Sequence, residues 1–362
     1  RNVAAVLMYE LMDSFTEEAL AAVSSAFGWS VQTAEAARAS GDSHWWKPLE
    51  SAMLVAGIVS RAVQDQTSDG NAGGGEASAA ASFCTSSVVA TALALIKSPQ
   101  HVPPVLWSRS MWVLGRFSWA LTSEQGSECF TVGATTLSSH QSVPVRMASC
   151  RALLELHPHL INSSESRASL LMSAVQGTCN LLSSTSGDAL PIVVGALSQF
   201  ITHAGPDIAA SVEPHLTPIL VQIWSAHAAN PHLCGSIVDV FQSIAVNPST
   251  LPGLQSRLLP TLCSLVSAHA TNLPGVVEYA LDLMAVIARG DAAAGTELPA
   301  SFVSMALPCV LQFMSVSDDN AGLTSGTTCM SAIVYAAKRT LQSMTLPRSS
   351  VTPVDSILSV VS

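Results

Sequence analysis

Charged residues are scarce in this sequence. Asp, Glu, Lys and Arg make up 11% of its 362 residues, against about 25% in an average soluble protein. Apolar residues reach 49%, which excludes disorder throughout the chain and predicts a large core under a surface of Ser, Thr, Ala, Gln and His. The formal net charge of −10 argues against a direct nucleic-acid partner and is compatible with a basic protein partner.

Long apolar runs are missing as well. A membrane-spanning helix needs about 20 predominantly apolar residues, and the charge-free windows 168–187 and 189–205 are interrupted by Ser, Thr, Gln, Asn, Gly and Pro. We therefore expect no membrane partner, and a membrane helical bundle is the least favoured alternative. No signal peptide is visible. The sequence opens at Arg1 in the middle of a pattern, so we expect a piece of a longer protein.

Motifs for catalysis, metal binding and disulfide frameworks do not occur. The eight cysteines form no CxxC pair and are spread evenly through apolar stretches, whereas disulfide frameworks and zinc sites cluster their cysteines. We interpret them as free, buried thiols of a protein from a reducing compartment, the cytosol or the nucleus. Neither GxSxG nor HExxH occurs, so we expect a protein that is not an enzyme and has no metal or cofactor.

What the sequence does contain is helical periodicity. Apolar residues recur at i, i+3, i+4, i+7 and i+8, the spacing of one helix face. The clearest stripe consists of Leu216, Ile219, Leu220, Ile223 and Trp224. Gly, Pro and Asn cluster between such stripes, where helices are expected to end and begin. Strand-like alternation is scarce, which favours an all-α fold.

The helices recur in pairs. Pro218, Pro260 and Pro308 stand at the same place in successive first helices, and their separations of 42 and 48 residues are typical of HEAT repeats, which have about 40–47 residues. Because two amphipathic helices cannot cover their apolar faces alone, such pairs stack on their neighbours. We predict an all-α HEAT-repeat α-solenoid, a superhelical array of antiparallel helix pairs over residues 1–362. The expected pairs are 83–97 with 103–121, 124–139 with 144–157, 167–184 with 188–203, 214–224 with 232–246, 256–266 with 274–289, and 304–314 with 322–340.

One segment interrupts the helical pattern. Residues 65–81, "DQTSDGNAGGGEASAAA", are rich in Gly and Ala and predict a flexible loop between helices. The segment is not a phosphate-binding loop, because Glu76 follows its last glycine where the P-loop pattern has a lysine.

Acidic residues on the second helices are the candidate functional residues. Second helices line one side of a solenoid, so a sparse set of carboxylates there could bind a basic cargo. Asp318 and Asp319 are also good helix N-caps, and a solvated face without a partner is the alternative for every member. The candidate cargo-facing residues are Glu155, Asp239, Glu278, Asp282, Asp318 and Asp319.

Four stretches resemble one known family. They are "SGDSHWWKPLESAMLVAGIV" at 40–59, "LWSRSMWVLGRF" at 106–117, "LQSRLLPTLCSLV" at 254–266 and "SDDNAGLTSGTTC" at 317–329. In order and content they are similar to the central HEAT repeats of a member of the importin-beta (karyopherin-beta) family of nuclear transport receptors. The 65–81 segment and the low number of charges depart from the family pattern.

The resemblance implies a function. Receptors of this family carry basic cargo such as core histones and ribosomal proteins, are controlled by the Ran GTPase, and contact the Phe-Gly repeats of nucleoporins while shuttling between cytoplasm and nucleus. We therefore expect a nuclear import receptor, and the alternative is a HEAT-repeat scaffold that assembles other proteins without a transport role. Trp45 and Trp46, adjacent on a helix and so about 100° apart, are expected to be structural wedges in two different helix seams.

Overall fold

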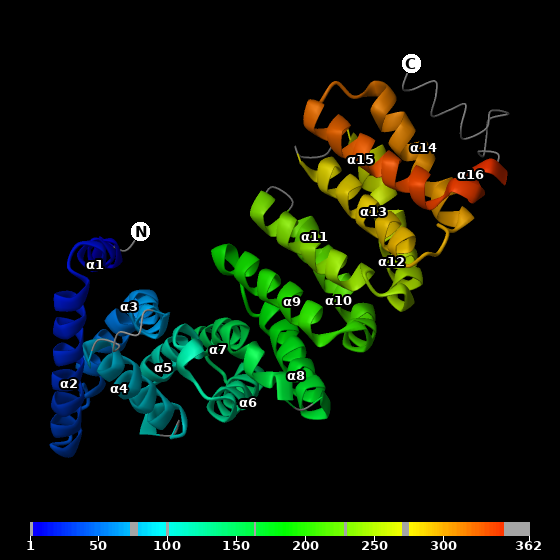
Figure 1. The fold of residues 1–362 in the computed structure, drawn as a ribbon. Helices are drawn as coiled ribbons and strands as arrows, with labels where there is room; N and C mark the ends of the chain where they lie inside the picture. Colours follow the sequence, from blue (N-terminus) through cyan, green and yellow to red (C-terminus); the bar gives the residue numbers. More distant parts are fainter. Residues whose placement is uncertain are drawn as a thin grey trace. The chain divides into compact units, whose positions relative to one another are not determined.

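The structure is a computed structural model that describes residues 3–72, 79–98, 101–162, 164–227, 230–269 and 275–343. Within these ranges every regular element is an α-helix or a short 3-10 helix (Figure 1). The predicted all-α class is confirmed. The chain forms two compact units, Arg1–Thr185 (unit 1) and Ser186–Ser362 (unit 2).

Unit 1 consists of two layers of helices. In the odd-numbered layer α1, α3, α5 and α7 pack in succession, and the even-numbered helices α2, α4, α6 and α8 cover them. Each helix thereby buries its apolar stripe between the layers, as in a helical-repeat solenoid. The bounds are α1 Val3–Ser14, α2 Thr16–Ala39, α3 Trp46–Ala72, α4 Ala79–Ile96, α5 Pro104–Arg116, α6 Ser123–Ser139, α7 Val143–Leu156 and α8 Ser164–Leu182, with 3-10 helices η2 Ser118–Ala120 and η3 His157–Asn162.

Unit 2 repeats the same two-layer plan. Helices α9, α11, α13 and α15 pack in succession as its odd-numbered layer, and α10, α12 and α14 form the even-numbered layer. The bounds are α9 Leu190–Ala204, α10 Pro206–Ala226, α11 Pro231–Ala245, α12 Leu251–Ser267, α13 Val276–Ala293, α14 Ala300–Val316, α15 Asn320–Ala336 and α16 Lys338–Ser343, with η4 Gly187–Ala189 and η5 Pro248–Thr250. All twelve predicted helices are present, with ends shifted by several residues. The border between the units falls between α8 and α9, which the sequence predicts as one pair.

The three repeating prolines lie inside the helices of the even-numbered layer. Pro218 is in α10, Pro260 in α12 and Pro308 in α14. An interior proline removes one backbone hydrogen bond and clashes with the preceding turn, which disfavours a regular helix. Each of the three helices nevertheless continues through its proline.

The predicted flexible segment 65–81 needs a correction at both ends. Helix α3 continues to Ala72 and α4 begins at Ala79. Residues 65–72 and 79–81 are therefore helical, and 73–78 lie outside the described residues. Alanine favours the helix, in agreement with the start of α4 at Ala79.

Trp45 and Trp46 are both half-buried, so neither is the fully enclosed wedge that the sequence predicts. Trp46 begins α3. The guanidinium of Arg38 from α2 lies 4.9 Å from the centre of the Trp45 ring. The pair of tryptophans thus closes the α2–α3 turn with one side of the rings against protein and the other toward solvent.

Helices of the odd-numbered layer approach closely where small residues meet. A Cβ atom added to Gly115 on α5 would lie 3.1 Å from Cα of Ala152 on α7. In unit 2 a Cβ atom on Gly290 of α13 would lie 2.7 Å from the carbonyl oxygen of Ala245. Larger side chains at these points would force the helices apart.

Among the described residues, no helix combines the length and the apolar character that crossing a bilayer requires.

Candidate protein-binding surfaces

Three of the predicted acidic residues come together in unit 2. Glu278 and Asp282 lie one turn apart on α13, and Asp319 precedes α15, which packs directly on α13. We call these three residues the acidic cluster. Glu278 and Asp282 are half-buried, whereas Asp319 is exposed.

Two members of the acidic cluster have raised pKa values. Burial raises the pKa of Glu278, and the charges of Asp319 and Asp282 raise it further. Burial also raises the pKa of Asp282, against the opposing influence of a hydrogen bond with Ser325 and the charge of Arg289. A cation placed here would relieve this repulsion, because opposite charges favour the ionised form of a carboxyl group.

Asp319 has a structural task in addition. Its carboxylate accepts hydrogen bonds from the backbone N–H groups of Ala321, at 3.2 Å, and Gly322, at 3.1 Å. It is therefore the N-cap of α15, and the capping interpretation is confirmed for this residue. Asp318 lies exposed beside it in the loop that leads from α14.

Asp239 lies on α11, the helix next to α13 in the odd-numbered layer. Its exposed carboxylate borders a cavity of about 740 Å³ between α9 and α11. Hydroxyl groups line part of this cavity: the Oγ atoms of Ser198 and Ser243 are 3.0 Å apart, and Oγ1 of Thr202 donates to Ser243 at 3.0 Å. The cavity is polar on one side and carries one negative charge.

Glu155 belongs to a different environment. It lies exposed on α7 of unit 1, where it lines a second, separate cavity together with Arg116 of α5 and Arg151 of α7. The sequence places Glu155 with the other acids because it occupies the same face of a second helix. It could not show that Arg116 from the neighbouring helix α5 lines the same cavity.

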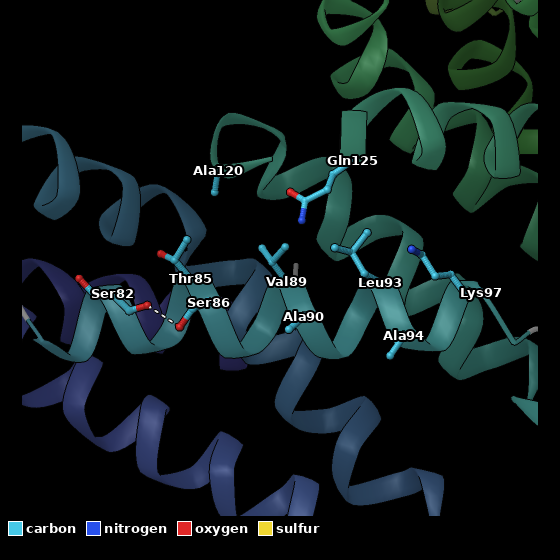
Figure 2. A pocket seen from close by; sticks show the side chains of 10 residues that line it. All are labelled: Ser82, Thr85, Ser86, Val89, Ala90, Leu93, Ala94, Lys97, Ala120 and Gln125. Atoms are coloured by element: carbon cyan, nitrogen blue, oxygen red, sulfur yellow. Dashed lines mark hydrogen bonds between the residues drawn. The ribbon is translucent and has the colours of Figure 1, made fainter. Parts of the chain in front are cut away.

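A groove in the even-numbered layer of unit 1 was missed at the level of sequence. Figure 2 shows side chains along one face of α4, among them Val89, Leu93 and Lys97, opposite Gln125 of α6. The groove measures about 770 Å³, and an ion pair of 2.9 Å between Nζ of Lys97 and Oε2 of Glu128 connects its two helices. The one sequence feature that could have indicated the groove is the apolar character of residues 86–96. A fully buried helix has the same character, so the sequence does not distinguish the two.

Most cysteine thiols with described side chains are enclosed by the core. Six of the seven cysteines with described side chains are buried and Cys179 is half-buried. Burial raises the pKa of Cys129 and of Cys150 to about 12, which keeps them protonated at neutral pH. Among the described residues, no three His, Cys, Asp or Glu side chains gather closely enough to hold a metal ion.

Known proteins resemble this chain only distantly. No family model matches it. Importin-9 of Drosophila melanogaster is 20% identical over 336 residues, which cover 91% of this chain and 31% of importin-9. The chain thus spans less than a third of that relative. Among solved structures, an engineered protein covers 91% of this chain and 98% of its own length, with 13% identity and a TM-score of 0.40, a likeness too weak to support an argument. The fold and this comparison together indicate a helical-repeat chain that is distantly similar to an importin.

Proposed function

We propose that this chain is a HEAT-repeat part of a nuclear import receptor of the importin-9 type. In this proposal the protein is not an enzyme. It carries basic cargo such as core histones and ribosomal proteins, releases or rearranges it under the control of the Ran GTPase, and shuttles between cytoplasm and nucleus. The similarity to importin-9 over 91% of the chain is the observation that supports the proposal most strongly.

The acidic cluster supports a basic cargo. Glu278 and Asp282 lie on α13 and Asp319 precedes α15, the next helix of the same layer. Burial raises the pKa values of Glu278 and Asp282, and neighbouring carboxylates raise that of Glu278 further. Lys or Arg side chains of a cargo would supply cations to these carboxylates and would also speed the encounter of the two proteins. Asp239 on the preceding helix extends the negative charge.

The groove of Figure 2 is the candidate contact for nucleoporin Phe-Gly repeats. Val89 and Leu93 present apolar surface between α4 and α6, and these two helices contact each other much less than α6 and α8 do. A phenylalanine ring could occupy such an opening between helices of the even-numbered layer, because burying an aromatic side chain is strongly favourable.

The alternative function is a HEAT-repeat scaffold that assembles other proteins. The low content of charged residues, 11% of the chain, favours this alternative, since a carrier of highly basic cargo is expected to have a denser acidic surface. A scaffold and a receptor differ in their response to Ran, so the test must include it.

The test mixes the full-length protein with a labelled core histone dimer, with and without GTP-bound Ran. We expect the double substitution Glu278→Gln with Asp282→Asn to weaken histone binding about fivefold to tenfold, since an ion pair of a partly exposed carboxylate contributes up to about 1 kcal/mol. The matched control is Glu17→Gln with Glu18→Gln on α2, which removes two exposed charges elsewhere. Absence of binding to both histone and Ran would contradict the transport function and favour the scaffold.

A further inference from the structure

A second charged site lies in unit 1, on the odd-numbered layer. A cavity of about 250 Å³ is lined by residues of α1, α3, α5 and α7, all of which belong to this unit. Its charged lining residues are Arg116, Arg151 and Glu155, and its aromatic lining residues are Tyr9 and Trp112. Two cations thus face one carboxylate in a chain whose formal net charge is −10.

One helix supplies the aromatic ring and the first arginine. Arg109, Trp112 and Arg116 lie at i, i+3 and i+7 on α5, so they share a face. Gly57 on α3 makes room for the ring, because an added Cβ atom would lie 2.2 Å from Cζ3 of Trp112. The carbonyl oxygen of Gly57 also accepts a hydrogen bond of 3.5 Å from Nε of Arg116. The ring and the guanidinium are therefore held in place before any ligand arrives.

The arginines differ in how far their charge is already neutralised. Arg109 donates to the carboxylate of Glu50 at 2.8 Å and lies 5.1 Å from the centre of the Trp112 ring. Within the described part of the chain, no carboxylate lies within ion-pair distance of Arg116 or Arg151. Arg151 reaches the cavity from α7 and is exposed. These two guanidinium groups are consequently available to an anion.

We propose that this cavity binds a carboxylate side chain, Asp or Glu, from an acidic segment of a partner protein. The guanidinium groups of Arg116 and Arg151 clamp the carboxylate from two helices, and each can donate two parallel hydrogen bonds to such a group. Trp112 and Tyr9 contact the apolar part of the peptide beside it, since aromatic rings are favoured at protein interfaces.

Size and charge select a carboxylate over a phosphate group. A volume of about 250 Å³ holds one or two side chains and no folded domain. Glu155 borders the cavity and repels an incoming anion. Arg116, Arg151 and Glu155 together carry one net positive charge, which a single carboxylate neutralises and a phosphate group with nearly two charges exceeds.

The site is independent of the basic-cargo function. It requires an acidic partner, it lies in unit 1, and it shares no residue with the acidic cluster of unit 2. A failure of histone binding would leave this proposal intact, and a failure of acidic-peptide binding would leave the transport proposal intact.

The experiment measures fluorescence anisotropy of short labelled peptides added to the chain of residues 1–362 at low ionic strength. One peptide carries several glutamates next to a leucine, a second replaces each glutamate by glutamine, and a third replaces them by phosphoserine. We expect the glutamate peptide to bind, and the glutamine peptide to bind at least about tenfold more weakly because the charge-assisted hydrogen bonds are lost. Equal binding of these two peptides, or tighter binding of the phosphoserine peptide, would overturn the proposal.

Substitutions locate the binding site. Arg151→Gln alone and Arg116→Gln with Arg151→Gln are expected to weaken glutamate-peptide binding, the double variant by about tenfold or more. Arg151→Lys keeps the charge but loses the planar fork, so its effect should be intermediate. Glu155→Gln should strengthen binding up to about fivefold by removing a like charge. The matched control Arg167→Gln on α8, a helix that does not line the cavity, should change nothing. Because Arg151 is exposed, unaltered affinity in the single variant Arg151→Gln would contradict the clamp even if the double variant failed to fold.

Discussion

Unit 1 contains six of the seven tryptophans and ten of the fifteen lysines and arginines, whereas unit 2 contains one tryptophan and five lysines and arginines. In unit 1 two arginines lie over tryptophan rings, Arg38 over Trp45 and Arg109 over Trp112. In unit 2 the acids dominate, and Arg257 pairs with a buried carboxylate instead. The apolar stripes produce the same layered helix pairs in both units, so the exposed surface of each unit was free to acquire its own chemistry.

The units also differ in how polar groups connect successive helices. In unit 1, beside the ion pairs of Arg109 with Glu50 and Lys97 with Glu128, one connection within the described residues is a cation without a carboxylate: Arg146 of α7 donates to the carbonyl oxygens of Leu137 at 2.8 Å and Gly177 at 3.3 Å, on α6 and α8. In unit 2 one connection is an acceptor. Glu213 of α10, almost fully buried, accepts from Arg257 of α12 and from Oγ1 of Thr217 at 2.9 Å. Removing a partner therefore leaves an unpaired donor in one unit and an unpaired buried charge in the other.

The largest effect is expected where the buried charge would be left alone. Arg257→Met leaves the carboxylate of Glu213 buried without its cation, which should lower the free energy of unfolding by about 3–5 kcal/mol. Urea denaturation followed by circular dichroism measures the loss. Glu213→Met with Arg257→Met removes both charges and should recover most of it. If the single and double variants were equally unstable, packing of the arginine stem, and not the ion pair, would connect α10 with α12.

The tryptophans of unit 1 give the next largest effect. Trp46 is half-buried, so Trp46→Ala should lower the free energy of unfolding by about 2 kcal/mol, near half of the loss for a fully buried tryptophan. Trp107→Ala on α5 is the matched comparison, because Trp107 is 4% exposed and should lose about 3–5 kcal/mol. Equal losses at the two positions would mean that the first tryptophan pair is as enclosed as the core, and would restore the wedge interpretation.

The fold was predictable because its determinants are local and repeated. Stripes such as Leu216–Trp224 set the helix faces, and the spacing of Pro218, Pro260 and Pro308 sets the repeat. Where composition alone was used, over 65–81, the prediction was wrong at both ends, because α3 continues to Ala72 and α4 begins at Ala79. Composition without a period does not locate the ends of a helix.

The candidate sites were predictable only in part. Sequence spacing places Glu278 and Asp282 on one face, and the structure adds Asp319 from the next repeat and half-buries both α13 residues. The arginine cavity around Glu155 was not predictable, since Arg116 and Arg151 are 35 residues apart and meet only through the packing of α5 on α7. Periodicity identifies which residues lie on one face of a helix. It does not identify which residues of another helix pack against that face.

A smaller effect tests the arginine–tryptophan contacts of unit 1. Arg38→Gln removes the cation over the Trp45 ring and should lower the free energy of unfolding by about 0.5–1 kcal/mol, as measured by urea denaturation. Arg38→Lys keeps a cation near the ring and should lose less. A neutral result for the glutamine variant would show that Arg38 covers the ring without stabilising it, and would remove one of the contrasts between the units.

The smallest effect on stability is expected from the acidic cluster of unit 2. The pKa values of Glu278 and Asp282 are raised in the folded protein, so their ionised forms are less stable there than in the unfolded chain. Glu278→Gln with Asp282→Asn should therefore leave the melting temperature at pH 7 unchanged or slightly higher. Thermal unfolding monitored by circular dichroism over a range of pH measures the difference.

The pH dependence of the stability difference between the double variant and the native protein tests whether the two carboxylates destabilise the fold. A carboxyl group with a raised pKa destabilises the fold above its folded pKa, and the effect disappears as the pH falls below the ordinary value of about 4. The native protein should thus gain stability relative to the double variant as the medium is acidified through this window. A double variant that is less stable than the native protein at pH 7 would instead show that these carboxylates have cationic partners. The acidic cluster would then be neutralised within the protein, as Arg109 is by Glu50 in unit 1.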